Sequence, residues 1–417
     1  MIFTSLSPNT QPDDIALARK MLLRPSHWHS HIALQKAAQA LSLHLPGSFV
    51  TLASSGRSAL EILLRALGIT SGDEVIMQAF TCIAVPEPVL WRRARPVYAD
   101  ILPRQYTISP DDVAKKITKK TKAIIVQHTF GMAADMEAVK QMAASRHIFV
   151  IEDCAHALGS TYKNQPLGTF ADAAIFSFGR DKSLSSVFGG AISVKNAGLL
   201  SKIQSIAHTY KPAPAVWVAQ QLLHPVIFNM ALPLYGKSGI GQGIIHLSQQ
   251  AGMVSKAVTQ AERLGSRPPH IAYRYPEALA HLLVNQLAKL PEYTNRRQAI
   301  SQRYFSGLSS FVFSLPKAAE DSRPAWLRFP LLLKNRAGFL SGAARSGIFL
   351  GDWYDAPLVP KNSNLVRFQY TLGSCPQAED AAAHVINLPT HPRLTDAEVD
   401  RIIEFTKAHG EPYYQTK

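Results

Sequence analysis

Short apolar stretches alternate with amphipathic or polar stretches from about Ser48 to Lys195. This pattern predicts strands at residues 49–53, 74–77, 96–100, 123–127 and 148–151, with helices at residues 59–67 and around Met136 to Met142. Strands separated by helical segments indicate crossover connections, and therefore a mainly parallel sheet covered by helices. Ligands of such sheets bind beyond the carboxyl ends of the strands. The polar residues that follow these strands are therefore the first candidates for a site.

The pattern changes near residue 211, and a chain of 417 residues is expected to form two domains. Residues 211–265 are apolar but interrupted by prolines and glycines, a long helical pattern begins at Ile271, and mixed α/β character extends from Phe311 to the end. We predict a large α/β domain with its N-terminal segment at residues 1–265, in which 211–265 form a connection, and a smaller C-terminal domain at residues 266–417.

Charge and cysteine usage limit the classes of function. The formal net charge of +15 could attract nucleotides, nucleic acid or anionic lipid. No zinc-finger spacing or RNP-like aromatic motif accompanies the charge, so we expect no nucleic-acid partner. Cys82, Cys154 and Cys375 lie far apart without metal-ligand spacing, and Met1 to Thr10 lacks the features of a signal peptide. We therefore expect a cytoplasmic protein without a metal site.

The residues Ser55-Gly56-Arg57-Ser58 lie between the first predicted strand and its helix. Glycine lets the backbone approach an anion, and free N–H groups at a helix N-terminus favour a phosphate. Arg57 and Ser58 would add side-chain donors to such a site. The same residues also fit a plain helix-capping turn, so the motif alone leaves both interpretations open.

Two further motifs place ionisable residues directly after apolar strands. The strand at 149–151 runs into an acidic pair that ends at Asp153, and such a carboxylate would keep a pyridine nitrogen protonated if that ring lay opposite it. Asp153 would otherwise cap the next element, and His156 taken alone is typical of a structural histidine. A second apolar strand at 174–176 leads to Lys182, whose surroundings suit the lowered pKa that imine formation needs. A surface lysine is the alternative there.

In their order along the chain, these motifs resemble the DegT/StrS family of PLP-dependent sugar aminotransferases, which have PLP fold-type I. The resemblance runs from about Leu41 to Lys195 and resumes near the C-terminus. The order of the motifs carries the resemblance, because each one alone is only moderately specific. The motifs are Ser55-Gly56, Gly72-Asp73-Glu74-Val75-Ile76, Pro96-Val97, Asp100, residues 121–125, Gly131, Asp135-Met136, residues 152–157, Gly168-Thr169-Phe170, Ser177-Phe178 before Lys182, residues 376–379 and residues 388–392.

The resemblance implies an α/β fold of the aspartate-aminotransferase type, with a mainly parallel seven-stranded sheet in the large domain and a smaller C-terminal α+β domain. It implies pyridoxal 5'-phosphate (PLP) as the cofactor, bound to Lys182 as a Schiff base, with Asp153 opposite the pyridine nitrogen and His156 near the phenolic oxygen. It also implies a homodimer. Contacts to the cofactor phosphate are expected from Gly56, Arg57, Ser58 and Ser177.

Several positions depart from the family pattern. Arg57 stands where threonine is usual, which suggests a charge-assisted contact with the phosphate. Cys82 occupies the position of the aromatic residue that usually stacks on the cofactor ring, so Cys82, His128 or another side chain covers the ring here. Ala272 stands where a partner subunit's asparagine usually reaches the phosphate, so Arg274 replaces that contact or the contact is absent.

The expected function is transfer of an amino group, from glutamate as the expected donor, to a keto-sugar attached to a nucleotide, in the biosynthesis of cell-surface polysaccharide or of secondary-metabolite sugars. Two alternatives remain: another PLP reaction, such as dehydration or aldol cleavage, and a non-enzymatic regulatory or scaffold protein. Family dehydratases tend to lack the lysine, so Lys182 favours transamination. The residues at Cys82, Phe188 and Ala272, which all depart from the family pattern, keep the scaffold alternative open.

Residues 214–247 are unusually apolar for a connection between domains. Pro225, Pro233 and polar side chains interrupt the stretch, so a membrane span is not expected. Two explanations remain. The segment is buried at a homodimer interface, or it makes weak contact with a membrane surface into which Trp217 and Phe228 dip.

Overall fold

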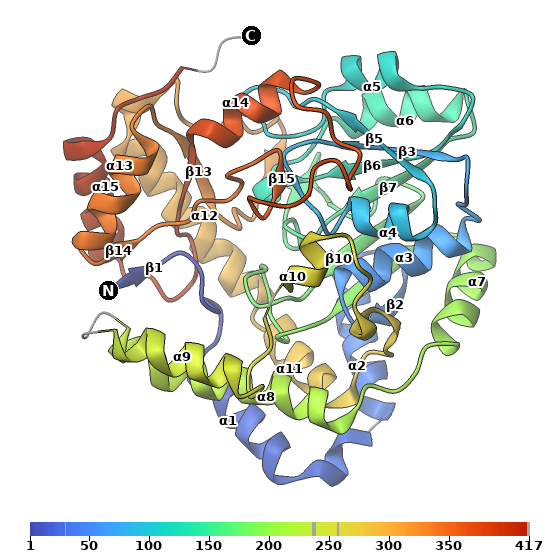
Figure 1. Cartoon of the computed structure of the whole chain (residues 1–417), viewed down its shortest axis with the longest axis horizontal. Coiled ribbons are helices and arrows are strands. Elements are labelled where there is room, and N and C mark those ends of the chain that lie inside the picture. Colours follow the sequence, from blue (N-terminus) through green and yellow to red (C-terminus); the bar gives the residue numbers. More distant parts are fainter. Residues whose placement is uncertain (30, 236–238, 257, 415–417) are drawn as a thin grey trace.

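The computed structural model describes residues 1–29, 31–235, 239–256 and 258–414, and its central element is a seven-stranded sheet (Figure 1). All strands run in one direction except β11, which is antiparallel to both of its neighbours, β10 and β2. The expected strands and the mainly parallel α/β fold are confirmed. Across the sheet the strands are β2 (Phe49–Ala53), β11 (Gly190–Val194), β10 (Ala173–Ser177), β7 (Phe149–Asp153), β6 (Thr121–Gln127), β3 (Glu74–Gln78) and β5 (Arg95–Ala99).

Helices cover both faces of this sheet, which explains why its central strands are almost continuously apolar. Successive side chains of β3 enter different clusters: Ile76 packs with Met136 and Val139, whereas Val75 and Met77 belong to the cluster on the other face. The helices that follow the strands are α3 (Gly56–Ala66), α4 (Pro86–Trp91), α5 (Pro110–Lys116), α6 (Met136–Ala144) and α7 (Ala197–His208).

A second group of helices lies at the base of the view in Figure 1. Within it α1 packs against α8, α8 packs against α9, and α2 packs against α11. α11 belongs to the predicted C-terminal domain, yet it packs on α2 of the predicted N-terminal domain. The domain boundary expected at residue 265 therefore stays a prediction. These helices are α1 (Pro12–Leu23), α2 (His31–Ser42), α8 (Ala215–Ala231), α9 (Ile240–Gln250) and α11 (Glu277–Leu287).

The apolar segment 214–247 thus forms α8 and α9, apart from residues 236–238, which lie outside the described residues. Phe228 is 6% exposed and packs on His224, with ring centroids 4.0 Å apart. The prediction that Phe228 dips into a membrane is therefore wrong, because its ring is already buried within the chain. By length and composition, the stretch Ala215–Leu234 is the one candidate for a membrane span among the described residues, and 44% of its 18-residue apolar window is buried in the protein.

The C-terminal part is held to the sheet by two contacts that bear on the site. β15 pairs in parallel with β4, which aligns Leu358 with Thr81. The carboxylate of Asp100 accepts hydrogen bonds from the N–H groups of Gln377 (2.9 Å) and Ala378 (2.8 Å) at the start of α14. The remaining helices are α10 (Gln260–Arg263), α12 (Leu290–Gly307), α13 (Arg336–Arg345), α14 (Pro376–His384) and α15 (Asp396–His409).

The other strands form small sheets, and one of them joins the two ends of the chain. β1 pairs with β14, so the N-terminus lies beside the C-terminal part (Figure 1). The short strands are β1 (Ile2–Phe3), β4 (Thr81–Cys82), β8 (Thr161–Tyr162), β9 (Gln165–Pro166), β12 (Ser322–Arg323), β13 (Phe329–Leu332), β14 (Ile348–Phe349), β15 (Leu358–Val359) and β16 (Val385–Leu388).

Candidate active site

A cavity of about 210 Å³ lies where β7 and β10 end, because Asp153 and Ser177 are the last residues of these strands and both line it. The expectation that polar residues gather at the carboxyl ends of the strands is met here. The predicted site residues that line the cavity are Gly56, Arg57, Asp153, His156, Ser177 and Lys182. Ser58 is not among the lining residues.

Asp153 presents a buried carboxylate to this cavity. The residue is 3% exposed, and its Oδ1 accepts a hydrogen bond from the backbone N–H of Ala155 at 2.9 Å. Burial raises the pKa of this carboxyl, while the Ala155 hydrogen bond and the positive charge of Lys182 oppose the rise. A cation or an N–H donor opposite Asp153 would stabilise its charged form.

Lys182 follows β10 through a tight turn, in which its backbone N–H donates to the carbonyl of Gly179 at 3.1 Å. The side chain of Asn9 donates to the Lys182 carbonyl and so ties this turn to the N-terminal segment. Burial lowers the pKa of the Lys182 amine, and nearby Cys82 and Asp153 partly oppose the shift. A lowered pKa increases the neutral, nucleophilic fraction of the amine at neutral pH.

His156 is held in one orientation by hydrogen bonds at both of its ring nitrogens. Its Nδ1 accepts a hydrogen bond from the N–H of Phe130 at 3.3 Å, and its Nε2 lies 3.3 Å from the hydroxyl of Tyr354. Burial lowers the pKa of His156 well below its ordinary value, and the charges of Lys182 and Arg328 lower it further. The ring is therefore neutral, and because Nδ1 accepts, the proton sits on Nε2 and is donated to Tyr354.

The first turn of α3 forms one side of the cavity, and two glycines allow its close approach to the sheet. A side chain at Gly56 would come within 3.1 Å of the Ser177 Cβ and fill the space between α3 and the end of β10. A side chain at Gly190 would come within 2.4 Å of the Ser55 backbone. The Ser55 side chain caps α3 by accepting a hydrogen bond from the N–H of Ser58.

Arg57 also borders the cavity, and its guanidinium is engaged with two carboxylates. Nη1 forms an ion pair with Glu262 of α10 and lies 3.4 Å from the carboxylate of Glu87 in α4. Burial raises the pKa of Glu87 to about 7, although the charge of Arg57 lowers it. These contacts tie α10 to the start of α3. Contact between Arg57 and a phosphate stays a prediction.

Two other residues considered for the phosphate also have partners within the chain. Ser58 is buried, and its hydroxyl donates to the carbonyl of Ile271 at 2.8 Å. Arg274 is exposed, and its Nε donates to the carbonyl of Tyr210 at 2.7 Å.

Cys82 and His128, the two residues considered for covering a cofactor ring, lie in different places relative to the cavity. Cys82 lines the cavity, whereas His128 is fully buried and is not a lining residue. The prediction that His128 covers the ring is therefore wrong, because its ring is engaged elsewhere. The aromatic side chains that line the cavity are Phe188, Trp353 and Tyr354.

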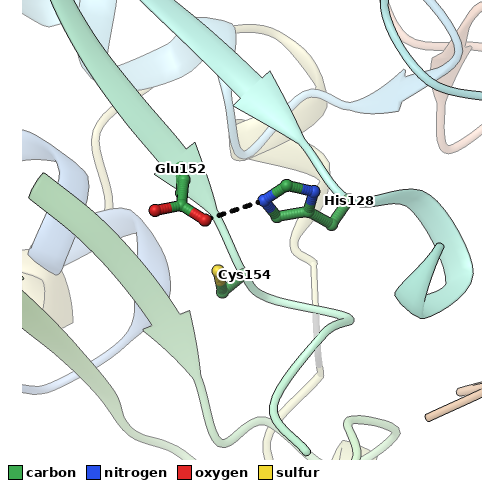
Figure 2. Close-up of side chains that lie close together, drawn as sticks. All are labelled: His128, Glu152 and Cys154. Carbon is green, nitrogen blue, oxygen red and sulfur yellow. Dashed lines mark hydrogen bonds and ion pairs between the residues drawn. The ribbon is translucent and has the colours of Figure 1, made fainter. Parts of the chain in front are cut away.

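Figure 2 shows where His128 is engaged: its ring points at Glu152 beside Cys154. The His128 Nε2 lies 3.1 Å from Glu152, and its Nδ1 accepts from the N–H of Ala134 at 3.1 Å. Both oxygens of Glu152 also accept backbone N–H groups between Gly168 and Ala171. Burial would raise the pKa of Glu152, but these hydrogen bonds hold it below its ordinary value. The His128 and Glu152 atoms that could bind a metal therefore already have hydrogen-bond partners within the chain.

Sequence reasoning missed the residues that reach the cavity from distant parts of the chain. Trp353 and Tyr354 come from the stretch between β14 and β15, and Val258 comes from the connection. Trp353 and Tyr354 follow a short apolar strand and Gly351, but this local pattern does not place them beside the large sheet.

Comparison with known proteins identifies the chain. The sequence model of the DegT/DnrJ/EryC1/StrS aminotransferase family matches residues 14–222 and 239–407. The chain belongs to this family. The resemblance seen in the sequence is thereby confirmed, and the protein is a PLP-dependent aminotransferase by family.

Relatives of this aminotransferase act on several sugars. It is 28% identical over 351 residues to the UDP-N-acetyl-3-dehydro-alpha-D-glucosamine 3-aminotransferase of Acidithiobacillus ferrooxidans, which covers 84% of this chain and 81% of the relative. It is 42% identical over 144 residues to the GDP-perosamine synthase of Escherichia coli O157:H7, a match that spans 34% of this chain and 40% of the relative. Among solved structures, DesV of S. venezuelae has a TM-score of 0.74 and 25% identity, with 94% of each chain covered.

The cavity of this aminotransferase fits PLP. Solved relatives include a PLP form of Spr1654 from Streptococcus pneumoniae and NtdA from Bacillus subtilis with bound PMP, the amine form of the cofactor. Here the buried carboxylate of Asp153 suits a pyridinium nitrogen, the Lys182 amine suits the aldehyde carbon, and the space kept open by Gly56 beside Ser177 suits the phosphate.

Proposed function

We propose that this aminotransferase moves an amino group from glutamate to the keto group of a sugar attached to a nucleotide. The observation that carries the proposal is the meeting of Lys182 and Asp153 in one cavity at the ends of neighbouring strands. The named sugar substrates of its relatives and the net charge of +15, which suits a diphosphate, support the choice of acceptor.

Asp153 and Lys182 have different roles in the proposed reaction. When PLP is bound, it supplies the electron sink that the chemistry needs. Asp153 holds a negative charge at the ring nitrogen and so keeps that nitrogen protonated. With PLP bound, the Lys182 amine would take the proton from the donor α-carbon as a positioned general base, and burial, which lowers its pKa, favours the neutral form that this role needs.

His156 and the cavity walls orient the reacting groups. The neutral His156 ring is fixed by Phe130 and Tyr354, so it presents one defined face beside Asp153. The aromatic side chains of Phe188, Trp353 and Tyr354 exclude water from the cavity, which strengthens its electrostatic interactions.

The test is to incubate the purified protein with PLP and glutamate and to measure release of 2-oxoglutarate. Transfer of nitrogen to a series of nucleotide-linked keto-sugars, followed by mass spectrometry, then identifies the acceptor. A protein that binds PLP but releases no 2-oxoglutarate would instead catalyse another PLP reaction. A protein that binds no PLP would favour the regulatory alternative, for which one relative of Geobacillus stearothermophilus, 28% identical and named a pleiotropic regulatory protein, is a precedent.

We also propose that the protein is a cytoplasmic homodimer that uses α8 and α9 at its interface. The exposed large apolar side chains of these helices are Val216 (81%), Met230 (58%), Ile240 (51%) and Leu247 (64%). Analytical ultracentrifugation should show a dimer that Val216→Ser with Met230→Ser converts to a monomer. A parent protein that stays monomeric, or that floats with anionic liposomes, would contradict this assignment and favour the membrane alternative.

A further inference from the structure

One buried side chain of the N-terminal segment, Asn9, holds the turn that carries Lys182. Asn9 is 0% exposed, and its amide nitrogen donates to the backbone carbonyls of Lys182 and of Ser183, the latter at 3.2 Å. Its amide oxygen accepts from the guanidinium of Arg297 in α12 at 2.6 Å. These partners fix the orientation of the amide, because only its NH2 group can donate to both carbonyls.

The backbone of Asn9 is anchored as well. Its carbonyl accepts hydrogen bonds from the hydroxyl of Tyr293 at 3.2 Å and from the side chain of Gln286 at 3.3 Å. Both partners are buried, and they belong to α12 and α11. Two helices therefore hold Asn9 in place, and the lysine turn docks on its amide.

A second contact of the same segment reaches the residue before Lys182. The backbone N–H of Ser7 donates to Oδ1 of Asp181 at 3.1 Å, and the Ser7 hydroxyl lies 2.7 Å from Nε2 of His224. Ser7 and its neighbour Leu6 both have a left-handed backbone, with φ of 59° and 72°. Residues other than glycine rarely adopt this conformation, and it persists where surrounding contacts fix it. The contacts of Ser7 therefore hold an unfavourable bend in place.

The carbonyls of the lysine turn depend on these contacts. Among the described residues, the Lys182 carbonyl accepts only from Asn9. The Ser183 carbonyl accepts from Asn9 and, at 3.4 Å, from Arg297. Buried backbone carbonyls are nearly always paired, so loss of the Asn9 amide should let the turn move until these groups find other partners.

An anchored backbone matters because the Lys182 amine has two positions in the proposed reaction. The amine is attached to the cofactor at rest and is free beside it when it takes the proton of the donor α-carbon. A general base must come within hydrogen-bonding distance of that proton, and a displacement of about 1 Å can cost about a hundred-fold in rate. The lysine side chain is a flexible four-carbon stem, so its backbone is the part that the fold can fix.

We propose that Asn9, together with Ser7, is a positioning residue that fixes the Lys182 turn, so that the amine meets the donor α-carbon in one place. The assignment rests on the proposed function. Neither Asn9 nor Ser7 lines the active-site cavity, so both act through the lysine turn and without contact with the substrate.

The test compares the parent holoenzyme with Asn9→Leu and Asn9→Asp. Leucine has a similar size but holds neither the two carbonyls nor Arg297, whereas aspartate restores the acceptor for Arg297 and still lacks the donors for the carbonyls. In single-turnover kinetics, both variants should lower the maximal rate of the glutamate half-reaction roughly 10- to 100-fold. The glutamate concentration that gives half of this rate should change little. With glutamate deuterated at the α-carbon, the primary isotope effect should rise in both variants, because proton transfer becomes the slowest step.

Tyr304→Phe is the matched control. Tyr304 is a buried residue of α12 whose hydroxyl donates to the carbonyl of Pro389 at 2.8 Å, a contact that does not involve the lysine turn. This variant should lower the thermal midpoint and keep the rate and the isotope effect of the parent.

A second readout needs neither cofactor nor turnover. Burial lowers the pKa of the Lys182 amine, so in the cofactor-free protein acetic anhydride should acylate it at a lower pH than an ordinary lysine. Asn9→Leu should let the turn move toward solvent, so the pH midpoint of acylation should rise toward the ordinary value. Peptide mass spectrometry measures this midpoint, which Tyr304→Phe should leave unchanged.

Parent-like rates and isotope effects in both Asn9 variants would overturn the assignment. Parent-like behaviour of Asn9→Asp alone would also overturn it, because the amide would then serve only Arg297. The same holds for variants that fail to fold, or for a Tyr304→Phe protein that shows the same changes. If the parent releases no 2-oxoglutarate but the acylation midpoint rises in Asn9→Leu, the proposed function fails while the positioning of Lys182 stands.

Discussion

Two buried arginines near the cavity are held in opposite ways. On the α3 side, Arg57 is paired with Glu262 and Glu87, so its charge is balanced within the chain. On the Trp353 side, Arg328 stacks on an aromatic ring and has no carboxylate partner among the described residues. The difference lies in their partners: carboxylates tie Arg57 to other segments of the fold, whereas Arg328 meets an aromatic face and, farther away, the negative charges of Asp181 and Asp352.

The largest effect is expected from Lys182→Ala, because Lys182 supplies the reacting amine of the cavity. This change should reduce amino transfer to background, because neither side carries another amine in that position. The covalent cofactor adduct that borohydride fixes in the parent should be absent by mass spectrometry. An adduct that persists on a different lysine would place the reaction elsewhere and break the comparison.

Asp153→Ala removes the buried carboxylate that lines the cavity. The barrier should rise by several kcal/mol, which is roughly a hundred-fold or greater loss of kcat, because the ring nitrogen then loses its stabilising anion. Steady-state kinetics measures the loss, and circular dichroism should show an unchanged fold. Near-normal turnover in this variant would mean that Asp153 only caps the element after β7.

Arg57→Ala tests whether the α3 side is a structural pair. It leaves two buried carboxylates without their cation, so the free energy of unfolding should fall by about 3–5 kcal/mol. Urea denaturation measures the loss, and adding Glu262→Gln to the same protein should recover part of it. A loss of less than about 1 kcal/mol, together with weaker retention of PLP during dialysis, would instead indicate that Arg57 serves the phosphate.

Glu87→Gln should have the smallest effect, and that effect depends on pH. Burial raises the pKa of Glu87 from an ordinary 4.5 to about 7, so between these values the folded chain keeps a proton that the unfolded chain releases. Stability of the parent therefore falls as pH rises from 4.5 to 7, by roughly 3 kcal/mol from this group. The difference in unfolding free energy between parent and variant should show this slope. A difference that is flat across the range would mean that Glu87 titrates normally.

The residues that sequence reasoning placed well share one property: they follow a strand or begin a helix. Asp153 and Ser177 end apolar strands, Lys182 follows the second of them through a turn, and parallel strands end at the same edge of a sheet. Local periodicity was therefore enough to bring them together. Local periodicity did not distinguish the two neighbouring residues of the turn at 55–58, however. Arg57 borders the cavity, whereas the Ser58 hydroxyl donates to the carbonyl of Ile271.

The order of residues along the chain thus specified the sheet, the lysine and aspartate at its edge, and the family, because periodic patterns and short motifs act through neighbouring residues. It did not specify that Glu262 pairs with Arg57, that His128 turns to Glu152, or that Trp353 stacks on Arg328. Each of these contacts joins segments that are distant in sequence or selects one of several nearby partners. Such choices follow from packing and from the need to compensate buried charges, which arise only when the whole chain has folded.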